Sequence, residues 1–156
     1  MPRCYTVNLT PTSISAATVD LIAVRAGTDV PIKVRALRVW QTSDFGDAQD
    51  EVVTLQLVRG NTTAGSGGAT PTPVPKDKKD AAASFTARTA DSTAASAGTT
   101  DVPYTTGWNV RAPFEMIFPD EMMARGDQAG GFIVLRLGAA PTDALVIGAS
   151  MDVIEG

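Results

Sequence analysis

The sequence predicts an all-β protein, an antiparallel sandwich of two sheets, and two observations carry the prediction. First, apolar and polar residues alternate over 5–9, over 53–57 and, for longest, over 145–153. A period of two is typical of strands with one buried face and one solvated face, as in antiparallel sheets. Second, no comparable stretch of helical periodicity interrupts these runs, although 119–126 has room for one helical turn.

Nine strands follow from this alternation and from the turn residues that bound it. The strand at 18–26 ends at the turn signal Gly27-Thr28-Asp29, and the last two strands are joined by a loop over 138–143. The predicted strands are 4–10, 18–26, 31–43, 51–59, 84–90, 104–111, 114–118, 131–137 and 144–154.

The longest of the early strands, 31–43, changes parity along its length. Ile32 and Val34 share one face of an ideal strand, whereas Leu37 and Val39 share the other. A β-bulge near Ala36 would produce such a change. The polar stretch that follows, 44–50, is expected to be a loop or a single helical turn.

One domain over 1–156 is the natural expectation, since this length can bury a sizeable core without disulfides or metals. With the first strand set aside as an extra, eight strands remain. Eight antiparallel strands favour a two-sheet jelly roll, with an immunoglobulin-like sandwich as the alternative. The alternative lacks its paired cysteines, because Cys4 is the only cysteine. We therefore expect a jelly roll plus an N-terminal strand.

The segment 61–80 departs from the strand pattern. It opens rich in Gly, Thr and Ser, continues with three prolines and ends in charged residues. Loops of this length inside a compact domain are usually functional or disordered. The composition therefore predicts a flexible Gly/Pro-rich arm or loop rather than part of the core.

Charge and the N-terminus restrict the partners. A net charge of −4 and a pI near 4.7 disfavour nucleic acid as a partner, because proteins that bind nucleic acid usually have a concentrated basic face. The basic residues here are mostly isolated arginines, with one small cluster at Lys76, Lys78 and Lys79. No signal peptide or bilayer-spanning stretch is visible. We expect a soluble protein made in the cytoplasm, without a membrane partner.

The chemistry available to the chain is limited, since it has no histidine and one cysteine. His-based metal centres and Ser-His-Asp or Cys-His nucleophiles cannot be built from it. Two acidic groups remain. Asp44, Asp47, Asp50 and Glu51 could bind Ca²⁺, but a solvated acidic turn explains them better. Asp120 and Glu121 could serve a glycosidase, yet helix-start acids explain them equally well. We expect no catalytic residues, metal or cofactor.

The two tryptophans, Trp40 and Trp108, allow two interpretations. An exposed pair could form a platform on which sugar rings stack. Aromatic residues on alternating strands are more often part of a core or an interface, so we favour that interpretation.

Several strings resemble small uncharacterised proteins of tailed phages and prophages. The resemblance rests on 41–51 (QTSDFGDAQDE), 57–68 (LVRGNTTAGSGG), 109–112 (NVRA) and 118–122 (FPDEM), and it covers most of the chain. It implies a structural role in the virion, decorating or cementing the head, in which jelly rolls often form trimers.

We therefore expect a non-enzymatic virion protein that forms a homo-oligomer, a trimer by the resemblance, and contacts the major capsid protein or other virion proteins. The arm would clasp a neighbouring subunit, and the first strand would pair across subunits or, alternatively, within its own domain. The residues expected in the arm are Asn61, Gly65, Gly67, Gly68, Pro71, Pro73, Pro75, Lys76, Lys78 and Lys79. Those expected at the edge strand are Tyr5, Val7 and Leu9. The rival class is a carbohydrate- or receptor-binding β-sandwich module.

Overall fold

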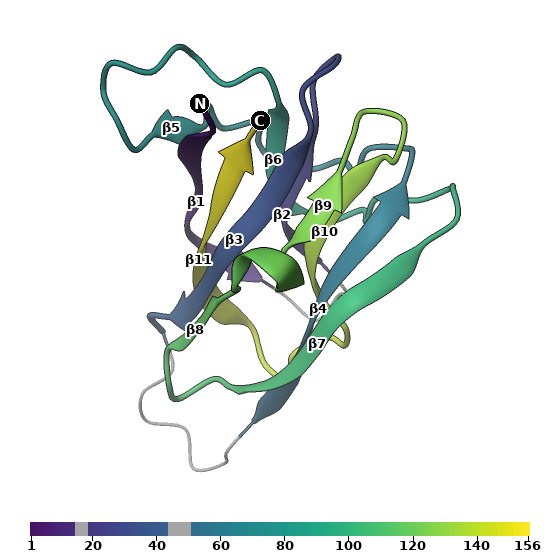
Figure 1. Ribbon diagram of the computed structural model, residues 1–156. Coiled ribbons are helices and arrows are strands. Elements are labelled where there is room, and N and C mark those ends of the chain that lie inside the picture. Colours follow the sequence, from purple (N-terminus) through teal and green to yellow (C-terminus); the bar gives the residue numbers. More distant parts are fainter. Residues whose placement is uncertain (15–18, 44–50) are drawn as a thin grey trace.

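The computed structural model describes residues 1–14, 19–43 and 51–156, and it is an antiparallel β-sandwich (Figure 1). Sheet A has the strand order β5-β1-β11-β3-β8, and β9 also pairs with β3. Sheet B has the order β6-β2-β10-β4-β7. The predicted fold class is confirmed.

The strand bounds agree closely with the nine predicted runs and add two short strands, β5 and β9. One 3₁₀ turn, η1 (Asp120–Met122), lies where a helical turn was predicted. The strands are β1 (Arg3–Ile14), β2 (Asp20–Arg25), β3 (Ile32–Gln41), β4 (Val52–Asn61), β5 (Val74–Pro75), β6 (Thr86–Asp91), β7 (Asp101–Asn109), β8 (Phe114–Ile117), β9 (Ala124–Gly126), β10 (Phe132–Leu137) and β11 (Leu145–Glu155). The loop predicted over 44–50 lies outside the described residues.

The connectivity is that of a jelly roll. Without β5, β6 and β9, eight strands remain, and their pairing orders are β1-β11-β3-β8 and β2-β10-β4-β7. Each sheet thus pairs early strands with late ones, the arrangement produced by a folded double Greek key. One expectation needs correction: the N-terminal strand is the first of the eight, and the additional long strand is β6 at the edge of sheet B. Spacing alone could not distinguish the two.

The parity change in β3 is a β-bulge, as predicted. Ala36 pairs with Asp152 and Val34 pairs with Val153, so Arg35 is the extra residue between them. Arg35 is exposed, whereas Val34 and Leu37 on either side are both buried in the core. The bulge therefore returns the second half of β3 to the core side of the sheet.

The main core fills the space between the two sheets, and β1 belongs to it. Tyr5, Val7 and Leu9 are buried at 0%, 0% and 4% exposure. The Tyr5 ring meets Phe85 edge to face, with the centroids 5.6 Å apart. The three side chains predicted at a subunit contact therefore pack inside their own sandwich, because β1 lies between β11 and β5 and turns its odd-numbered residues inward.

A second, smaller cluster lies on the opposite side of sheet B. Phe132 and Val134 of β10 pack there with Ala23 of β2 and with Ala95, which comes from outside the sheet. As a result β10 is buried on both faces along nearly its whole length. The described part of the chain contains no helix long and apolar enough to cross a bilayer.

Substitutions at two neighbouring positions of β1 test its place in the core. Val7→Ala should lower the free energy of unfolding by about 2 kcal/mol, since it removes buried methyl groups and leaves a small cavity. Asn8→Ala, one residue along and exposed, should change the free energy by less than about 0.5 kcal/mol. Urea unfolding measures both. Equal losses at the two positions would contradict a buried face on β1.

Candidate functional site

The predicted arm belongs to a long insertion, residues 62–100, between β4 and β7. The chain leaves β4, reaches the far edge of sheet A as β5, returns as β6 beside β2 and then runs to β7 (Figure 1). The insertion therefore links the edges of both sheets on one side of the sandwich. Every arm residue named from the sequence lies in it or, for Asn61, at its start.

Two stretches of the insertion pair with each other and form what we call the ribbon, residues 62–70 and 89–98. Thr63 pairs with Ser96, Ser66 with Thr93 and Ala69 with Thr89. Their backbone N–H groups donate to the partner carbonyls over 2.9–3.0 Å in both directions. The ribbon contributes Ala95 to the small cluster on sheet B, so it covers the outer face of that sheet.

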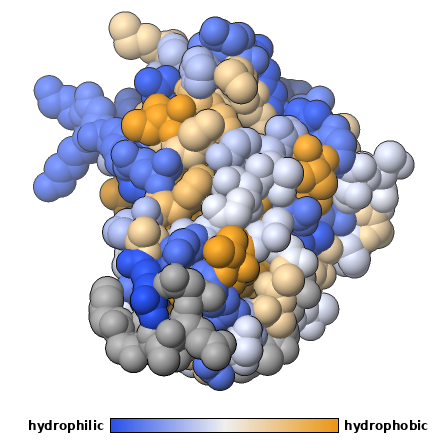
Figure 2. Space-filling model, turned by 90° about the horizontal axis from the view of Figure 1, so that it is seen from below, coloured by the Kyte–Doolittle hydropathy of each residue, from blue (hydrophilic) through white to orange (hydrophobic). Residues whose placement is uncertain are grey.

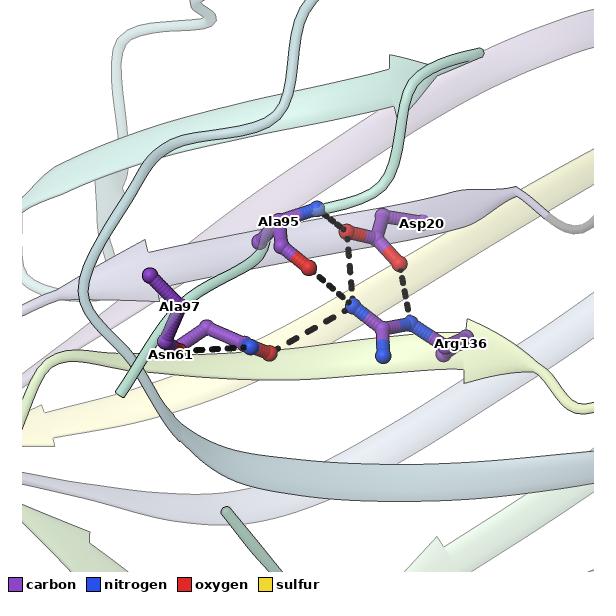
Figure 3. A network of polar contacts seen from close by, with 5 residues as sticks. All are labelled: Asp20, Asn61, Ala95, Ala97 and Arg136. Carbon is purple, nitrogen blue, oxygen red and sulfur yellow. Dashed lines mark hydrogen bonds and ion pairs between the residues drawn. The ribbon is translucent and has the colours of Figure 1, made fainter. Parts of the chain in front are cut away.

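A polar network beneath the ribbon fixes it to sheet B (Figure 3). Arg136 of β10 donates from Nε to Asp20 Oδ1 of β2 over 2.6 Å, and from Nη2 to the Ala95 carbonyl over 3.0 Å. The Ala95 N–H donates to Asp20 Oδ2 over 2.6 Å. Asn61 at the end of β4 accepts from Arg136 over 3.4 Å and donates to the Ala97 carbonyl over 3.2 Å.

The burial of this network makes its pairing obligatory. Asp20 is only 1% exposed, and the Arg136 side chain is 18% exposed. A buried carboxylate without a partner costs several kcal/mol, so either residue alone would destabilise the fold. Because the backbone of Ala95 adds a hydrogen bond to each member of the pair, the ribbon and the sheet stabilise each other.

A second ion pair holds the ribbon at its other end. Asp91 lies opposite Asp20 in the pairing of β6 with β2, and Arg88 binds it with two hydrogen bonds of 2.8 and 2.9 Å. Asp91 also accepts the Gly68 N–H over 3.1 Å. Two buried carboxylates, each with its own arginine, therefore secure the two halves of the ribbon.

The glycines of the insertion have a structural reason that differs from the predicted flexibility. A Cβ at Gly68 would lie 1.9 Å from the Thr89 carbonyl oxygen, and one at Gly65 would lie 2.6 Å from the Thr93 oxygen. Gly67 has a φ of +92°, a conformation that L side chains rarely adopt. The glycines let two backbones approach closely, so the expectation of a free arm is corrected to an ordered cover.

The prolines and lysines lie at the β5 end of the insertion. Pro75 is paired with Tyr5, and the Lys76 N–H donates to the Cys4 carbonyl over 2.8 Å. Pro71 and Pro73 are partly buried, whereas Lys78 and Lys79 are exposed. The segment around β5 thus joins its own sheet, whereas the lysine tip, Lys78 and Lys79, projects into solvent.

Lys76 also contributes to an ionic cluster on the outer face of sheet A, around Asp152. Its Nζ lies 3.3 Å from Asp152 Oδ1, which also accepts the Thr6 hydroxyl over 2.7 Å. Arg38 donates to Asp152 Oδ2 over 3.0 Å. Burial alone would raise the pKa of Asp152, but these hydrogen bonds and the charges of Arg38 and Lys76 outweigh it and lower the pKa.

The acidic residues singled out in the sequence that the structure describes have other partners or lie on the surface. Asp44, Asp47 and Asp50 lie outside the described residues, and Glu51 Oε1 accepts the Thr142 N–H. Asp120 lies 3.6 Å from Arg125 and 3.9 Å from Lys33, on the 3₁₀ turn beside Glu121. In the described part of the chain, no three side chains of the usual ligand types are grouped as a metal site would need.

Sequence reasoning missed the Asp20–Arg136 pair. Its only signal is a charged residue at a position of each strand where the neighbours on both sides are apolar. Comparison with known proteins adds nothing to the geometry: no family model, curated protein or solved structure matches the chain.

Removal of Arg136 tests whether the network holds the ribbon. Arg136→Ala should lower the free energy of unfolding by about 3 kcal/mol, because Asp20 stays buried without its charge partner. Hydrogen exchange should accelerate most at Ser66, Thr93 and Ala95. Adding Asp20→Asn should recover part of the loss, since the buried charge is then gone.

Arg59→Ala is the matched control, because it breaks an arginine–carboxylate pair, with Asp101, that lies at the surface. It should cost less than about 1 kcal/mol and leave exchange in the ribbon unchanged. Equal costs for the two arginines, or unchanged ribbon exchange in Arg136→Ala, would contradict the role given to the network.

Proposed function

We propose that this chain is a non-enzymatic structural protein of a virion, which decorates or cements a phage capsid. It does so as a homotrimer and through contacts with the major capsid protein or other virion proteins. The jelly-roll architecture and the resemblance of 41–51, 57–68, 109–112 and 118–122 to tailed-phage proteins support this proposal. The function is assembly, so its site is a surface and not a pocket.

The observation that carries the proposal is a concentration of exposed apolar side chains on one side of the sandwich. Six large hydrophobic side chains are exposed in the described part of the chain, and three of them, Val102, Ile117 and Met122, lie between 101 and 122. We call these three the apolar edge. They come from β7, β8 and η1, next to the free edges of both sheets.

A contact between two aromatic rings joins the two sheet edges at this place. Tyr104 of β7 meets Phe118, the residue after β8, edge to face with the centroids 5.1 Å apart. Val102 and Tyr104 share a side of β7, and Met122 follows Phe118 by one turn. Burying these side chains against identical copies would remove apolar area from water, the main driving force of association.

The backbone of this edge favours a closed assembly over an open one. Pro103 lies in β7, the last strand of sheet B, and it has no N–H to offer to another strand. Prolines on edge strands suppress open-ended sheet pairing. Association through side chains with closed symmetry is then preferred, and a stable interface would bury about 1,600 Å² in total.

The insertion has a different role in this proposal from the one expected of a clasping arm. Its ribbon is committed to sheet B of the same chain, and β5 is committed to β1. The lysine tip, Lys78 and Lys79, remains available for contacts with an acidic surface of a capsid subunit. Tyr5, Val7 and Leu9 take no part, because they are buried.

Light scattering across a concentration series tests the proposal. The unaltered chain should have the mass of a trimer, and Ile117→Asp with Met122→Asp should shift it to a monomer, because charges would then have to be buried at the interface. Val74→Asp is the matched control: Val74 is 54% exposed, against 53% for Ile117, but lies on the opposite edge of the same sheet.

The control variant should stay trimeric. A monomeric mass for the unaltered chain at every concentration would overturn self-association in solution. Dissociation by Val74→Asp, with none by the substitutions at 117 and 122, would move the interface to the β5 edge.

A further inference from the structure

The two tryptophans occupy opposite environments. Trp108 is 2% exposed in the core, and its Nε1 donates to the Ala112 carbonyl over 2.7 Å. Trp40 lies on the outer face of sheet A, near the end of β3, and is only partly buried. Trp40 and Arg38 are two positions apart in β3, so both side chains lie on this outer face and point away from the core.

The Trp40 ring lies flat on the sheet. Trp40 is paired with Gly148 of β11, and a Cβ at Gly148 would lie 2.5, 2.6 and 2.7 Å from Cε2, Cζ2 and Nε1 of the ring. Three adjacent ring atoms at nearly equal distances place the glycine under the face of the indole and not at its edge. Gly148 therefore provides the space in which the ring can lie against the strand.

A cleft of about 460 Å³ opens beside this ring. One wall is the end of β3 from Arg38 together with Thr42, which follows it, and the other is the turn from Val110 to Pro113 with the start of β8. The Trp108–Ala112 hydrogen bond and the Ala112 N–H donation to the Asn109 carbonyl over 3.0 Å hold the turn in place. The cleft volume falls in the range of small-ligand sites.

Few polar groups border the cleft, and their geometry is fixed. Arg38 donates from Nε to Glu115 Oε2 over 2.7 Å while its Nη1 donates to Asp152. The guanidinium is thus held between two carboxylates. Arg111 also borders the cleft, so these two arginines and two carboxylates together carry no net charge. Arg38 and Glu115 offer hydrogen-bond donors and acceptors beside a flat aromatic surface.

We infer that this cleft binds a neutral pyranose ring of an oligosaccharide, with the sugar stacked on Trp40 and its hydroxyl groups bonded to Arg38 and Glu115. The axial C–H groups of a pyranose carry a partial positive charge and are attracted to the negative face of an indole. A planar aromatic surface beside a fixed set of donors and acceptors suits a ring that is apolar on its faces and polar around its rim.

The surrounding surface favours such a small ligand over a second protein. Figure 2 views the molecule from below, the end at which β3 stops and β8 begins in Figure 1. Among the coloured residues of this view, hydrophobic ones appear as separate spots between hydrophilic ones. Protein interfaces have a more continuous apolar centre. The apolar edge and the cleft use different residues, so this inference stands independently of the proposed assembly.

Isothermal titration calorimetry with cellohexaose, chitohexaose and maltohexaose tests the inference, because its readout does not depend on Trp40. At least one of the three should give a saturable binding signal at ligand concentrations below about 5 mM, a range in which millimolar Kd values are detected. Trp40→Ala should weaken that binding by about 10-fold or more through the loss of the stacking surface, whereas Trp40→Phe should retain most of it. Asn8→Ala, exposed on the outer face of sheet A but outside the cleft, should bind normally.

Gly148→Ala provides a second test in which the tryptophan is kept. The added methyl group would displace the ring from the sheet, so the fluorescence of Trp40 should shift and the affinity should fall while the circular dichroism spectrum stays native. The inference is overturned if none of the three oligosaccharides binds, or if Trp40→Ala, shown to be folded by the same spectrum, binds as well as the unaltered chain.

Discussion

The buried ion pair between Arg136 and Asp20 is the interaction on which the arrangement of this sandwich depends. It joins β10 to β2 within sheet B, reaches Asn61 at the end of β4 and is completed by the backbone of Ala95 in the ribbon. Replacing a satisfied ion pair by apolar residues can be neutral, but leaving one charge alone is costly. The pair therefore couples the insertion to sheet B, because the backbone of Ala95 completes the hydrogen bonds of both buried charges.

The position of the insertion leaves part of the molecular surface covered and the rest accessible. Sheet B is covered on its outer face by the ribbon, and β1 is flanked by β11 and β5. The outer face of sheet A and the side formed by β7 and β8 remain accessible, and the apolar edge and the Trp40 cleft are found there. A rigid cover over one face directs contacts with other molecules to the rest of the surface.

Alternation in the sequence predicted nine of the strands, because a strand that is buried on one face has apolar residues at every second position. It also predicted a bulge near Ala36, and the structure has it one residue earlier, with Arg35 as the extra residue. It could not rank the strands, because spacing does not show whether β1 or β6 is the additional one. The strands β5 and β9, of two and three residues, are too short to show a period.

The ribbon was missed for a different reason. Glycine serves equally for a flexible chain and for two backbones in close approach, and only the position of Gly68 beside Thr89 distinguishes these cases.

The claim that the insertion belongs to its own sandwich is tested most directly by a disulfide between β1 and β5. Thr6 and Val74 are paired across these strands, and such partners are close enough to be bridged when both are replaced by cysteine and Cys4 by serine. After oxidation and denaturation without reductant, we expect the covalent mass of one chain, whatever the mass of the native assembly. A ladder of covalent dimers and trimers would show that the insertion clasps a neighbour and would contradict the closed sandwich described above.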